Sequence, residues 1–310
     1  MRIWLINNTR FGYKNNSTAW SDTMFDYFNS SFLPMLKKHH KDGDVVVHCG
    51  NLFNNSESIN TRILNKTMEL FDSITGICDL YLVVGENDRV LNNSNSTMNI
   101  FKHHDRITVV SDSVMVGPVK LVAWAIDVEM DCGVCITSSD VSKCEVEPTC
   151  KVYSGYGGDA KRVDGNIISV GSAYQLDYSG GDNGFYIIDS VSGKDMFVKN
   201  NYSPVHKVLV VNTMSDLESI DRDYVDKNNI CVKINNSLVE ESKIKTDILL
   251  SKYKFKKIEY FCDGVTEVRE KVDYDFSSIE DMIRSKLSAT CSDETLLEFD
   301  NIISIYKEKY

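Results

Sequence analysis

Four turns in the chain put polar or charged side chains beside glycine at the ends of apolar runs. One of them, Gly50-Asn51-Leu52-Phe53-Asn54, follows the apolar run from Val45 to Cys49. In α/β proteins the carboxyl ends of strands are where ligands gather, and acidic side chains there hold metals or move protons. In this turn, amides stand where such carboxylates would be useful. Its residues therefore fit either an ordinary turn or a site without its charges.

The other three turns follow further apolar runs along the chain. They are Asn8-Thr9-Arg10-Phe11-Gly12, Gly85-Glu86-Asn87-Asp88 and Gly155-Tyr156-Gly157-Gly158. Carboxylates occur only in the second of these, on Glu86 and Asp88. Because a guanidinium stays protonated at any ordinary pH, Arg10 brings a permanent cation to the first.

The pattern of apolar residues predicts the elements that position these turns. Residues 1–7 are predicted as a strand, and residues 21–40 as a helix with a kink or a new start at Pro34. Residues 44–50 form a continuous apolar run, which is typical of a strand in a sheet covered on both faces. A helix over 58–75 and a strand over 78–88 complete a β-α-β-α-β series, which favours a layered α/β sheet.

Beyond residue 90 the pattern changes. Residues 106–199 predict short strands joined by Gly-rich turns, in an antiparallel meander. Strand and helix patterns alternate again in the next segment, and the tail from 277 predicts a helix-turn-helix pair. The predicted domains are therefore 1–204, a small α/β domain over 205–272 and a helical segment over 273–310.

Composition narrows the classes of function. The 310 residues include 34 Lys and Arg against 45 Asp and Glu, a formal net charge of −11. A protein that binds DNA by itself usually shows a basic face, so a nucleic-acid contact here needs a local patch or a more basic partner. No apolar run reaches the roughly 18 residues that cross a bilayer, so we expect a cytoplasmic protein with no membrane contact. The nine cysteines, several within apolar runs, suit a reducing compartment.

Taken in order, the four turns resemble those of the calcineurin-like metallophosphoesterases, and most closely the SbcD-type nuclease subunits of phage recombination systems. The most specific part follows the fourth turn: Val170-Gly171-Ser172, then Tyr174-Gln175-Leu176, an acidic Gly-rich turn and the strand Gly184 to Asp189. The resemblance covers nearly the whole chain. It implies a layered α-β-β-α metallophosphoesterase sandwich, a small α/β capping domain and a C-terminal helix-turn-helix pair.

The positions that hold metal in that family carry other side chains here. The family's Asp-x-His-x-Gly is replaced by the turn from Asn8, its bridging Asp by Asn51, and its Gly-Asn-His-Asp by the turn from Gly85. A later Gly-His motif falls near Thr137, and the final Gly-His-x-His falls on the turn from Gly155. The resemblance thus identifies as degenerate site positions Asn8, Arg10, Asn51, Glu86, Asn87, Ser138, Tyr156 and Gly158.

Charge explains why these replacements matter. Two divalent ions roughly 3.5–4 Å apart need anionic and imidazole ligands to offset their repulsion. Of the family's ligand positions only Glu86 holds a carboxylate, where the family has Asn, and Asp88 stands at the place of an orienting residue. We therefore expect no cofactor, and a catalytically inactive subunit that acts as a scaffold or interaction protein in phage DNA recombination, repair or counter-defence.

Two alternatives stay open at this point. One is a divergent nuclease with a rebuilt Mn or Mg site at Glu86 and Asp88. The other is a module that binds phosphate, nucleotide or DNA ends without hydrolysis, with Arg10, Lys161 and Arg162 as its anion-binding residues. If the protein is encoded by a phage, it would work in the cytoplasm of the infected cell.

A separate group of cysteines allows a structural metal. Cys132, Cys135, Cys144 and Cys150 lie within a short segment and would supply the four thiolates of a zinc knuckle. Their spacing fits no strong template, so four small core or loop residues are the other interpretation. Such a zinc ion would be structural and not catalytic.

The resemblance also implies partners. SbcD-type subunits work with an SMC-like ATPase of the SbcC type, on whose coiled coil their C-terminal helices dock, and DNA would be reached through that complex. The other interpretation of the tail is packing on its own domain. The subunits also form homodimers through helices near the second and third motifs, which makes Ile63, Leu64 and Met68 candidates for that contact. The predicted docking residues are Ile279, Met282, Ile283, Leu287, Leu296, Phe299, Ile303 and Tyr306.

Overall fold

The computed structural model divides the chain into two compact units, Met1–Phe261 and Cys262–Tyr310. The structure describes residues 1–90, 96–123, 132–141, 149–157, 160–238 and 250–261, and the side chains of 161–164 are outside this description. All described residues belong to the first unit. The predicted docking residues between 279 and 306 therefore lie outside the described part, and so do Cys144 and Gly158.

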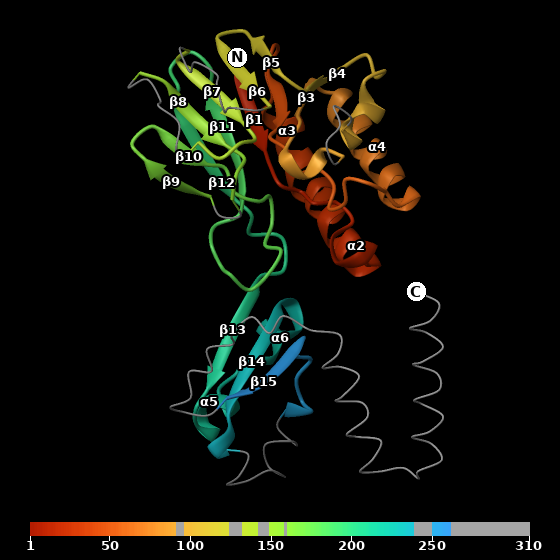
Figure 1. Ribbon diagram of the computed structural model, residues 1–310. Coiled ribbons are helices and arrows are strands. Elements are labelled where there is room, and N and C mark those ends of the chain that lie inside the picture. Colours follow the sequence, from red (N-terminus) through yellow and green to blue (C-terminus); the bar gives the residue numbers. More distant parts are fainter. Residues whose placement is uncertain (91–95, 124–131, 142–148, 158–159, 239–249, 262–310) are drawn as a thin grey trace, which may run out of the picture. The chain divides into compact units, whose positions relative to one another are not determined.

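The first sheet contains the strands that precede three of the four turns (Figure 1). Its order is β12-β11-β1-β2-β3-β4, in which β1 to β4 are parallel and β11 and β12 are antiparallel additions. The continuous apolar run at Val45–His48 is buried along its whole length, as expected for a parallel strand covered on both faces. The strands of this sheet are β1 (Arg2–Ile6), β2 (Val45–His48), β3 (Asp79–Val83), β4 (Ile107–Val110), β11 (Gly184–Asp189) and β12 (Asp195–Lys199).

The second sheet corrects the expected antiparallel meander. Its order is β5-β6-β7-β8-β10-β9, and the four central strands β6, β7, β8 and β10 run parallel. Only the edge pairs β5-β6 and β9-β10 are antiparallel. The central strand β7 is buried at every residue, which is the pattern of parallel strands and not of a half-exposed meander. The strands are β5 (Ser113–Val116), β6 (Val119–Val122), β7 (Val134–Thr137), β8 (Lys151–Ser154), β9 (Lys161–Asp164) and β10 (Ile167–Ser169).

A third sheet has three parallel strands in the order β13-β14-β15. It has its own small apolar cluster, which includes Val211, Leu217 and Val232. Thr213 caps α5, because its hydroxyl accepts from the backbone N–H of Asp216. The elements are β13 (His206–Val211), α5 (Met214–Glu218), α6 (Arg222–Lys227), β14 (Asn229–Asn235) and β15 (Lys257–Phe261).

The remaining helices come from the first 101 residues. The predicted helix over 21–40 is interrupted as expected, because Pro34 has no N–H to donate to the carbonyl of Ser30 and the backbone widens there into a π-helical turn. The first element, α1, is a left-handed turn at Lys14 and Asn15. The elements are α1 (Tyr13–Asn16), α2 (Thr18–Tyr27), η1 (Phe28–Phe32), α3 (Leu33–His39), α4 (Thr61–Thr75), η2 (Glu86–Asp88) and η3 (Thr97–Phe101).

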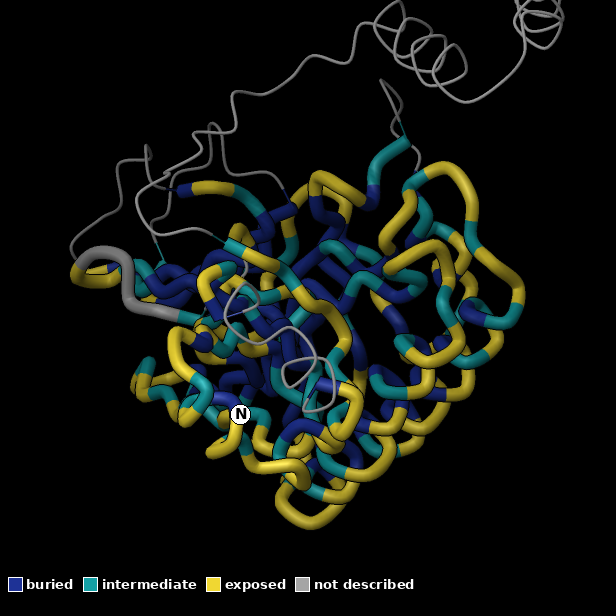
Figure 2. The backbone as a smooth tube through the Cα atoms, turned by 90° about the horizontal axis from the view of Figure 1, so that it is seen from below, coloured by how far each residue is buried: buried dark blue, intermediate teal, exposed yellow. Residues whose placement is uncertain are grey.

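Strand β11 shows what covers each face of the first sheet. Phe185 stacks on Trp4 and meets the edge of Phe32, so this face is covered by the helical segment around η1. The next residue, Tyr186, contacts Tyr153 of the second sheet. Because successive side chains of a strand point to opposite faces, helices cover one face and the second sheet covers the other (Figure 1). Residues of both sheets share one buried core, and the exposed residues lie around it (Figure 2).

The fold is therefore mixed α/β with mostly parallel sheets and few helices, in agreement with the α/β class predicted from the sequence. The outer face of the second sheet carries a smaller buried cluster that includes Val122, Cys135 and Val152. The chain connections beside this face, residues 124–131 and 142–148, lie outside the described part.

Candidate functional site

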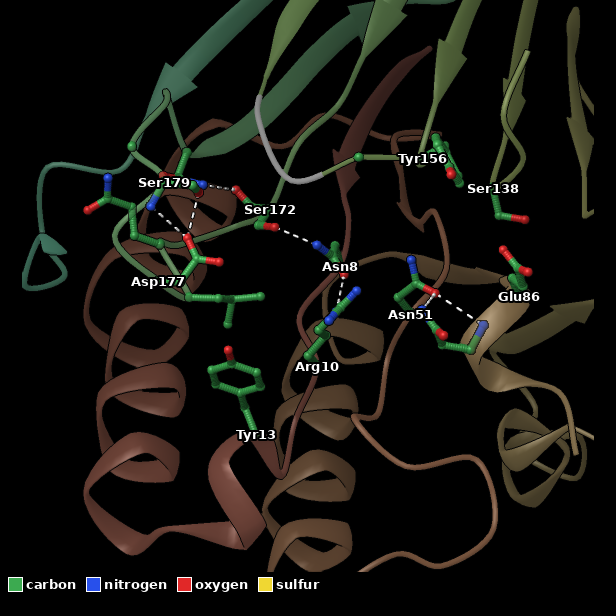
Figure 3. A pocket seen from close by; sticks show the side chains of 16 residues that line it. Asn8, Arg10, Tyr13, Asn51, Glu86, Ser138, Tyr156, Ser172, Asp177 and Ser179 are labelled. Carbon is green, nitrogen blue, oxygen red and sulfur yellow. Dashed lines mark hydrogen bonds between the residues drawn. The ribbon is translucent and has the colours of Figure 1, made fainter. Parts of the chain in front are cut away.

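The four turns identified in the sequence meet at one pocket of about 450 Å³ (Figure 3). Seven of the eight degenerate positions line it, although they come from distant parts of the chain. Gly158 is outside the described part. The residues that line the pocket are Asn8, Arg10, Tyr13, Asn51, Glu86, Asn87, Ser138, Tyr156, Gly157, Ser172, Gln175, Leu176, Asp177, Ser179, Gly180 and Asn183.

Close backbone contacts hold the turns together below the pocket. A Cβ atom on Gly155 would overlap the carbonyl oxygen of Cys49, and one on Gly85 would lie 2.8 Å from the backbone nitrogen of Asn51. Only glycine lets the main chains approach this closely. The side-chain amide of Asn7 donates to the carbonyls of Gly155 and Gly171, at 2.9 Å each. The turns are therefore fixed to one another by backbone packing as well as by side chains.

Asp88 joins the second and third turns. Its Oδ2 accepts from the backbone N–H of Asn51 at 2.7 Å and of Gly85 at 2.9 Å, and its Oδ1 accepts from that of Leu52 at 2.9 Å. Complete burial raises the pKa of this carboxyl to about 6, although the amide hydrogen bonds act in the opposite direction. Asp88 thus positions two turns, and both of its oxygens are used by the backbone.

Three residues of the pocket have left-handed backbone conformations. Asn8, Arg10 and Asn51 have φ angles of 51°, 43° and 56°. Asparagine tolerates this region better than most residues, but arginine rarely adopts it. Residues held in such conformations are concentrated at functional sites. All three residues line the pocket, and the side chains of Asn8 and Arg10 hydrogen-bond to each other.

Several polar side chains of the pocket form hydrogen bonds with one another. The Nε of Arg10 donates to Oδ1 of Asn8 at 2.9 Å, and Nδ2 of Asn8 donates to the hydroxyl of Ser172 at 2.5 Å (Figure 3). On the other side, Nδ2 of Asn87 donates to Oδ1 of Asn51 at 3.1 Å. The side-chain oxygens of Asn8 and Asn51, which would have to bind a metal ion, thus accept hydrogen bonds from neighbouring side chains.

The donor set does not fit a binuclear metal centre. Asp88 is used by backbone amides, Arg10 adds a cation, and Glu86 is exposed at the rim. Neutral amides cannot bridge two divalent ions, whose repulsion requires anionic ligands. Among the described residues, no group of three or more His, Cys, Asp and Glu side chains is arranged to hold a metal ion. No catalytic step through a metal is therefore assigned to this pocket.

The structure adds pocket residues that the motifs did not single out as site residues. Tyr13, Asp177 and Ser179 all line the pocket. The pKa of Asp177 lies below its usual value, because the hydroxyl and backbone N–H of Ser179 donate to its carboxylate. The acidic Gly-rich turn after Leu176 was the signal available in the sequence. In the sequence, this turn supports the fold and indicates no site residue.

A buried polar pair lies under the first two turns. The Nε2 of His48 is 2.9 Å from the hydroxyl of Thr9, which itself donates to the carbonyl of Leu52 at 3.0 Å. Because that hydroxyl hydrogen is already used, His48 must donate from Nε2. Complete burial lowers the pKa of His48 to about 3, so the ring is neutral and serves to support the turns.

Two predicted groups are not among the described residues that line the pocket. Lys161 and Arg162 are on β9 at the edge of the second sheet, and because their side chains are outside the described part, their role in anion binding stays a prediction. Cys135 and Cys150 are buried on the outer face of the second sheet, and Cys132 packs against them. A hydrogen bond from Cys135 lowers the pKa of Cys132. Because Cys144 is outside the described part, the zinc knuckle stays a prediction.

The predicted homodimer contact needs one correction. Ile63 is 1% exposed and belongs to the chain's own core, so it is not available to a second copy. Leu64 is half-buried, and Met68 is 48% exposed. Helix α4 is amphipathic, and the periodic pattern of the sequence alone does not predict which of its apolar residues are buried in the core and which are exposed. Only Met68 remains as an open surface position among the three.

Comparisons with known proteins identify no family for this chain. No protein-family model matches the chain, and no curated protein matches it either. The metallophosphoesterase resemblance therefore stays a prediction that rests on the motifs. A search for membrane-spanning segments is also negative, since none of the described helices is both long enough and apolar enough.

Proposed function

We propose that this chain is a catalytically silent, SbcD-like member of the metallophosphoesterase fold that acts as a scaffold or interaction protein in DNA recombination, repair or counter-defence. The observation that carries the proposal is the convergence of the four turns. They meet at one pocket, in the order that the resemblance implies, yet the side chains that they bring to it are neutral amides, a guanidinium, a phenol and one rim carboxylate. The fold of a hydrolytic site is kept without its chemistry.

The main argument against hydrolysis is that the polar groups are already used. The side-chain oxygens of Asn8 and Asn51 accept hydrogen bonds from Arg10 and Asn87. The oxygens of Asp88 accept hydrogen bonds from backbone amides. A rebuilt site would have to release several of these bonds, and each costs about 1 kcal/mol or more when a buried group is left unpaired. A divergent nuclease is therefore the weaker proposal.

The charge of the pocket also weakens the phosphate-binding alternative. Among the described lining residues, Arg10 is the one cation, while Glu86 and Asp177 are both acidic. One of the guanidinium donors is already bound to Asn8. A phosphate carries up to two negative charges and would be repelled by the two carboxylates. We therefore do not place an anion-binding function at this pocket.

A nuclease assay tests the proposal. The purified full chain is incubated with Mn²⁺ or Mg²⁺ and labelled single- or double-stranded DNA, and calorimetry measures Mn²⁺ binding in parallel. We expect no cleavage above the protein-free blank and no binding heat, for the wild type and for Glu86→Gln alike. Mn²⁺-dependent cleavage that disappears in Glu86→Gln would contradict the proposal and favour the divergent nuclease.

A further inference from the structure

A second pocket, of about 460 Å³, lies next to the first and has the opposite charge. It is lined by residues of α1 and α2, by Tyr178 and by residues at the ends of β13, α6 and β14. Neighbouring residues separate the two pockets, since Tyr13 lines the first and Lys14 the second. None of the sequence motifs pointed to it.

Three lysines give this pocket its charge. Lys14, Lys227 and Lys256 line it, and Asp226 is its one acidic lining residue among those described. The carboxylate of Asp226 is already 3.9 Å from the Nε of Arg222. Within the described part of the chain, none of the three lysines forms an ion pair. The pocket is therefore locally cationic in a chain whose net charge is −11.

Aromatic rings form one wall of the same pocket. Trp20 and His206 stack with their centres 4.9 Å apart and their planes 6° from parallel. Tyr178 meets His206 edge-on, at 5.3 Å. The ammonium group of Lys14 lies 4.6 Å from the centre of the Trp20 ring. Aromatic rings beside lysines are the combination that proteins use to hold bases and their phosphates.

His206 supplies the second, independent sign of a ligand. Its side chain lines the pocket and is 5% exposed, yet neither ring nitrogen has a hydrogen-bond partner. Its backbone N–H donates to Oε1 of Gln175 at 2.7 Å, so the main chain is held while both ring nitrogens are left for a ligand. A buried polar group without a partner is costly, and in native proteins such groups usually mark a missing ligand or water.

His206 is suited to bind a ligand through an uncharged imidazole ring. Burial and the nearby charge of Lys14 lower its pKa to about 4, while Asp177 acts weakly in the opposite direction. At neutral pH the ring therefore has one N–H donor and one acceptor nitrogen. Such a pair matches the mixed donors and acceptors at the edge of a nucleobase.

The backbone that presents Lys14 is strained. Lys14, Asn15 and Asn16 have φ angles of 51°, 55° and 60°, three left-handed residues in succession without a glycine. A lysine rarely adopts this conformation, and residues held this way are concentrated at ligand sites. The left-handed turn is what holds the Lys14 ammonium above Trp20.

We propose that this second pocket binds a nucleotide unit, with its base against the aromatic wall and its phosphate among Lys14, Lys227 and Lys256. The unit would come either from a free nucleotide or from one residue of a single strand. Duplex DNA cannot place a paired base in a pocket, so it is not a ligand. The inference does not rest on the proposed function, because the two pockets share no lining residue.

Binding assays on the full chain test this proposal. Fluorescein-labelled oligothymidylate, thymidine monophosphate and a short duplex are titrated, with polyglutamate as a generic polyanion. The pocket variant is Lys14→Gln, Lys227→Gln and Lys256→Gln. Its matched control removes the same charge from exposed lysines outside the pocket, through Lys37→Gln, Lys38→Gln and Lys41→Gln.

We expect the pocket variant to bind roughly tenfold more weakly or worse, while the control binds like the wild type. For the single strand, the slope of log affinity against log salt should fall by about 0.7, since the pocket holds one phosphate and each lost phosphate contact removes about 0.7. Binding should quench fluorescence from Trp20, and Trp20→Phe should lose this quench while keeping the fold.

The two sources separate in the same experiment. Binding of the monophosphate identifies a free nucleotide as a sufficient ligand, while binding of the oligonucleotide alone identifies a strand. Absence of binding to both would overturn the proposal. So would equal losses in the pocket variant and its control, or equal affinity for polyglutamate, because each would reduce the effect to overall charge.

Discussion

At the scale of one residue, Asp88 shows how a single buried carboxylate can position two turns of the first pocket. The carboxylate is fully buried and accepts backbone N–H groups from both the Asn51 turn and the Gly85 turn. Amide donors favour the charged form, while burial disfavours it, and burial is the larger effect on its pKa. The residue therefore holds the pocket together at a cost that depends on pH.

Replacing Asp88 by Asn should reveal this cost. A carboxyl whose pKa is raised to about 6 stabilises the fold below its unfolded pKa, and this stability is lost as the pH rises through 6. Asn does not titrate, so the stability advantage of the wild type over Asp88→Asn should shrink by about 2 to 3 kcal/mol between pH 4 and pH 7. Urea unfolding of both proteins across this range measures the difference.

Asp44 provides the matched control. Burial acts to raise its pKa, but hydrogen bonds from Arg2 and Lys41 and the charge of Arg2 bring it below the usual value overall. Its stabilisation is present above the unfolded pKa and is lost only as the pH falls through the lowered value. The advantage over Asp44→Asn should therefore stay flat from about pH 5 to pH 7. An advantage over Asp88→Asn that grows with pH would mean that the amide bonds outweigh burial.

At the scale of elements, long periodic segments were predictable and strand direction was not. The helix over 58–75 is observed as α4 (Thr61–Thr75), and the interruption at Pro34 is observed as a π-helical turn. The strands between Ile107 and Lys199 were also recognised, but they were placed in an antiparallel meander. Gly-rich turns suggested hairpins, whereas full burial of β7 is the property that identifies its parallel neighbours, and burial is a tertiary property.

The first pocket was predictable because strand ends recur with glycine and polar residues. The motifs located seven of its residues, since each turn carries a local sequence signal. The second pocket carries none. Trp20 and His206 are 186 positions apart and look like ordinary amphipathic residues, and only the tertiary structure stacks them. Left-handed backbone at Lys14 is equally invisible, since lysine gives no hint of positive φ.

The close approach of the turns gives a prediction at this scale. Gly155→Ala adds a Cβ that overlaps the carbonyl oxygen of Cys49, a backbone atom that cannot move away easily. We expect a loss of about 3 kcal/mol in the free energy of unfolding. Gly133→Ala is the control, because nothing lies within 4 Å of the added Cβ, and it should cost less than about 0.5 kcal/mol. Urea denaturation measures both, and equal stabilities would contradict the close packing of the turns.

For the whole molecule, charge separates the two pockets. The chain carries a net charge of −11, and the first pocket follows this trend with two carboxylates against Arg10. The second pocket departs from it, with three lysines against one aspartate. Of these two pockets, the second is therefore the one whose charge attracts an anion. With a chain charge of −11, the proposed nucleotide contact at this pocket would have to be local.

The proposed docking of the tail on an SMC-like ATPase can be separated from packing on its own domain by stability. In the double variant Leu296→Asp and Ile303→Asp, self-packing would bury two charges against the domain and cost several kcal/mol. Docking on a partner would leave the isolated chain unchanged. We expect the same unfolding midpoint as the wild type, and loss of co-purification with a co-expressed SbcC-type ATPase. Val191→Asp and Met196→Asp, at positions that are 82% and 56% exposed, control for the added charge. A lowered midpoint would show that the apolar residues of the tail are already covered within the chain, and would remove the argument for docking.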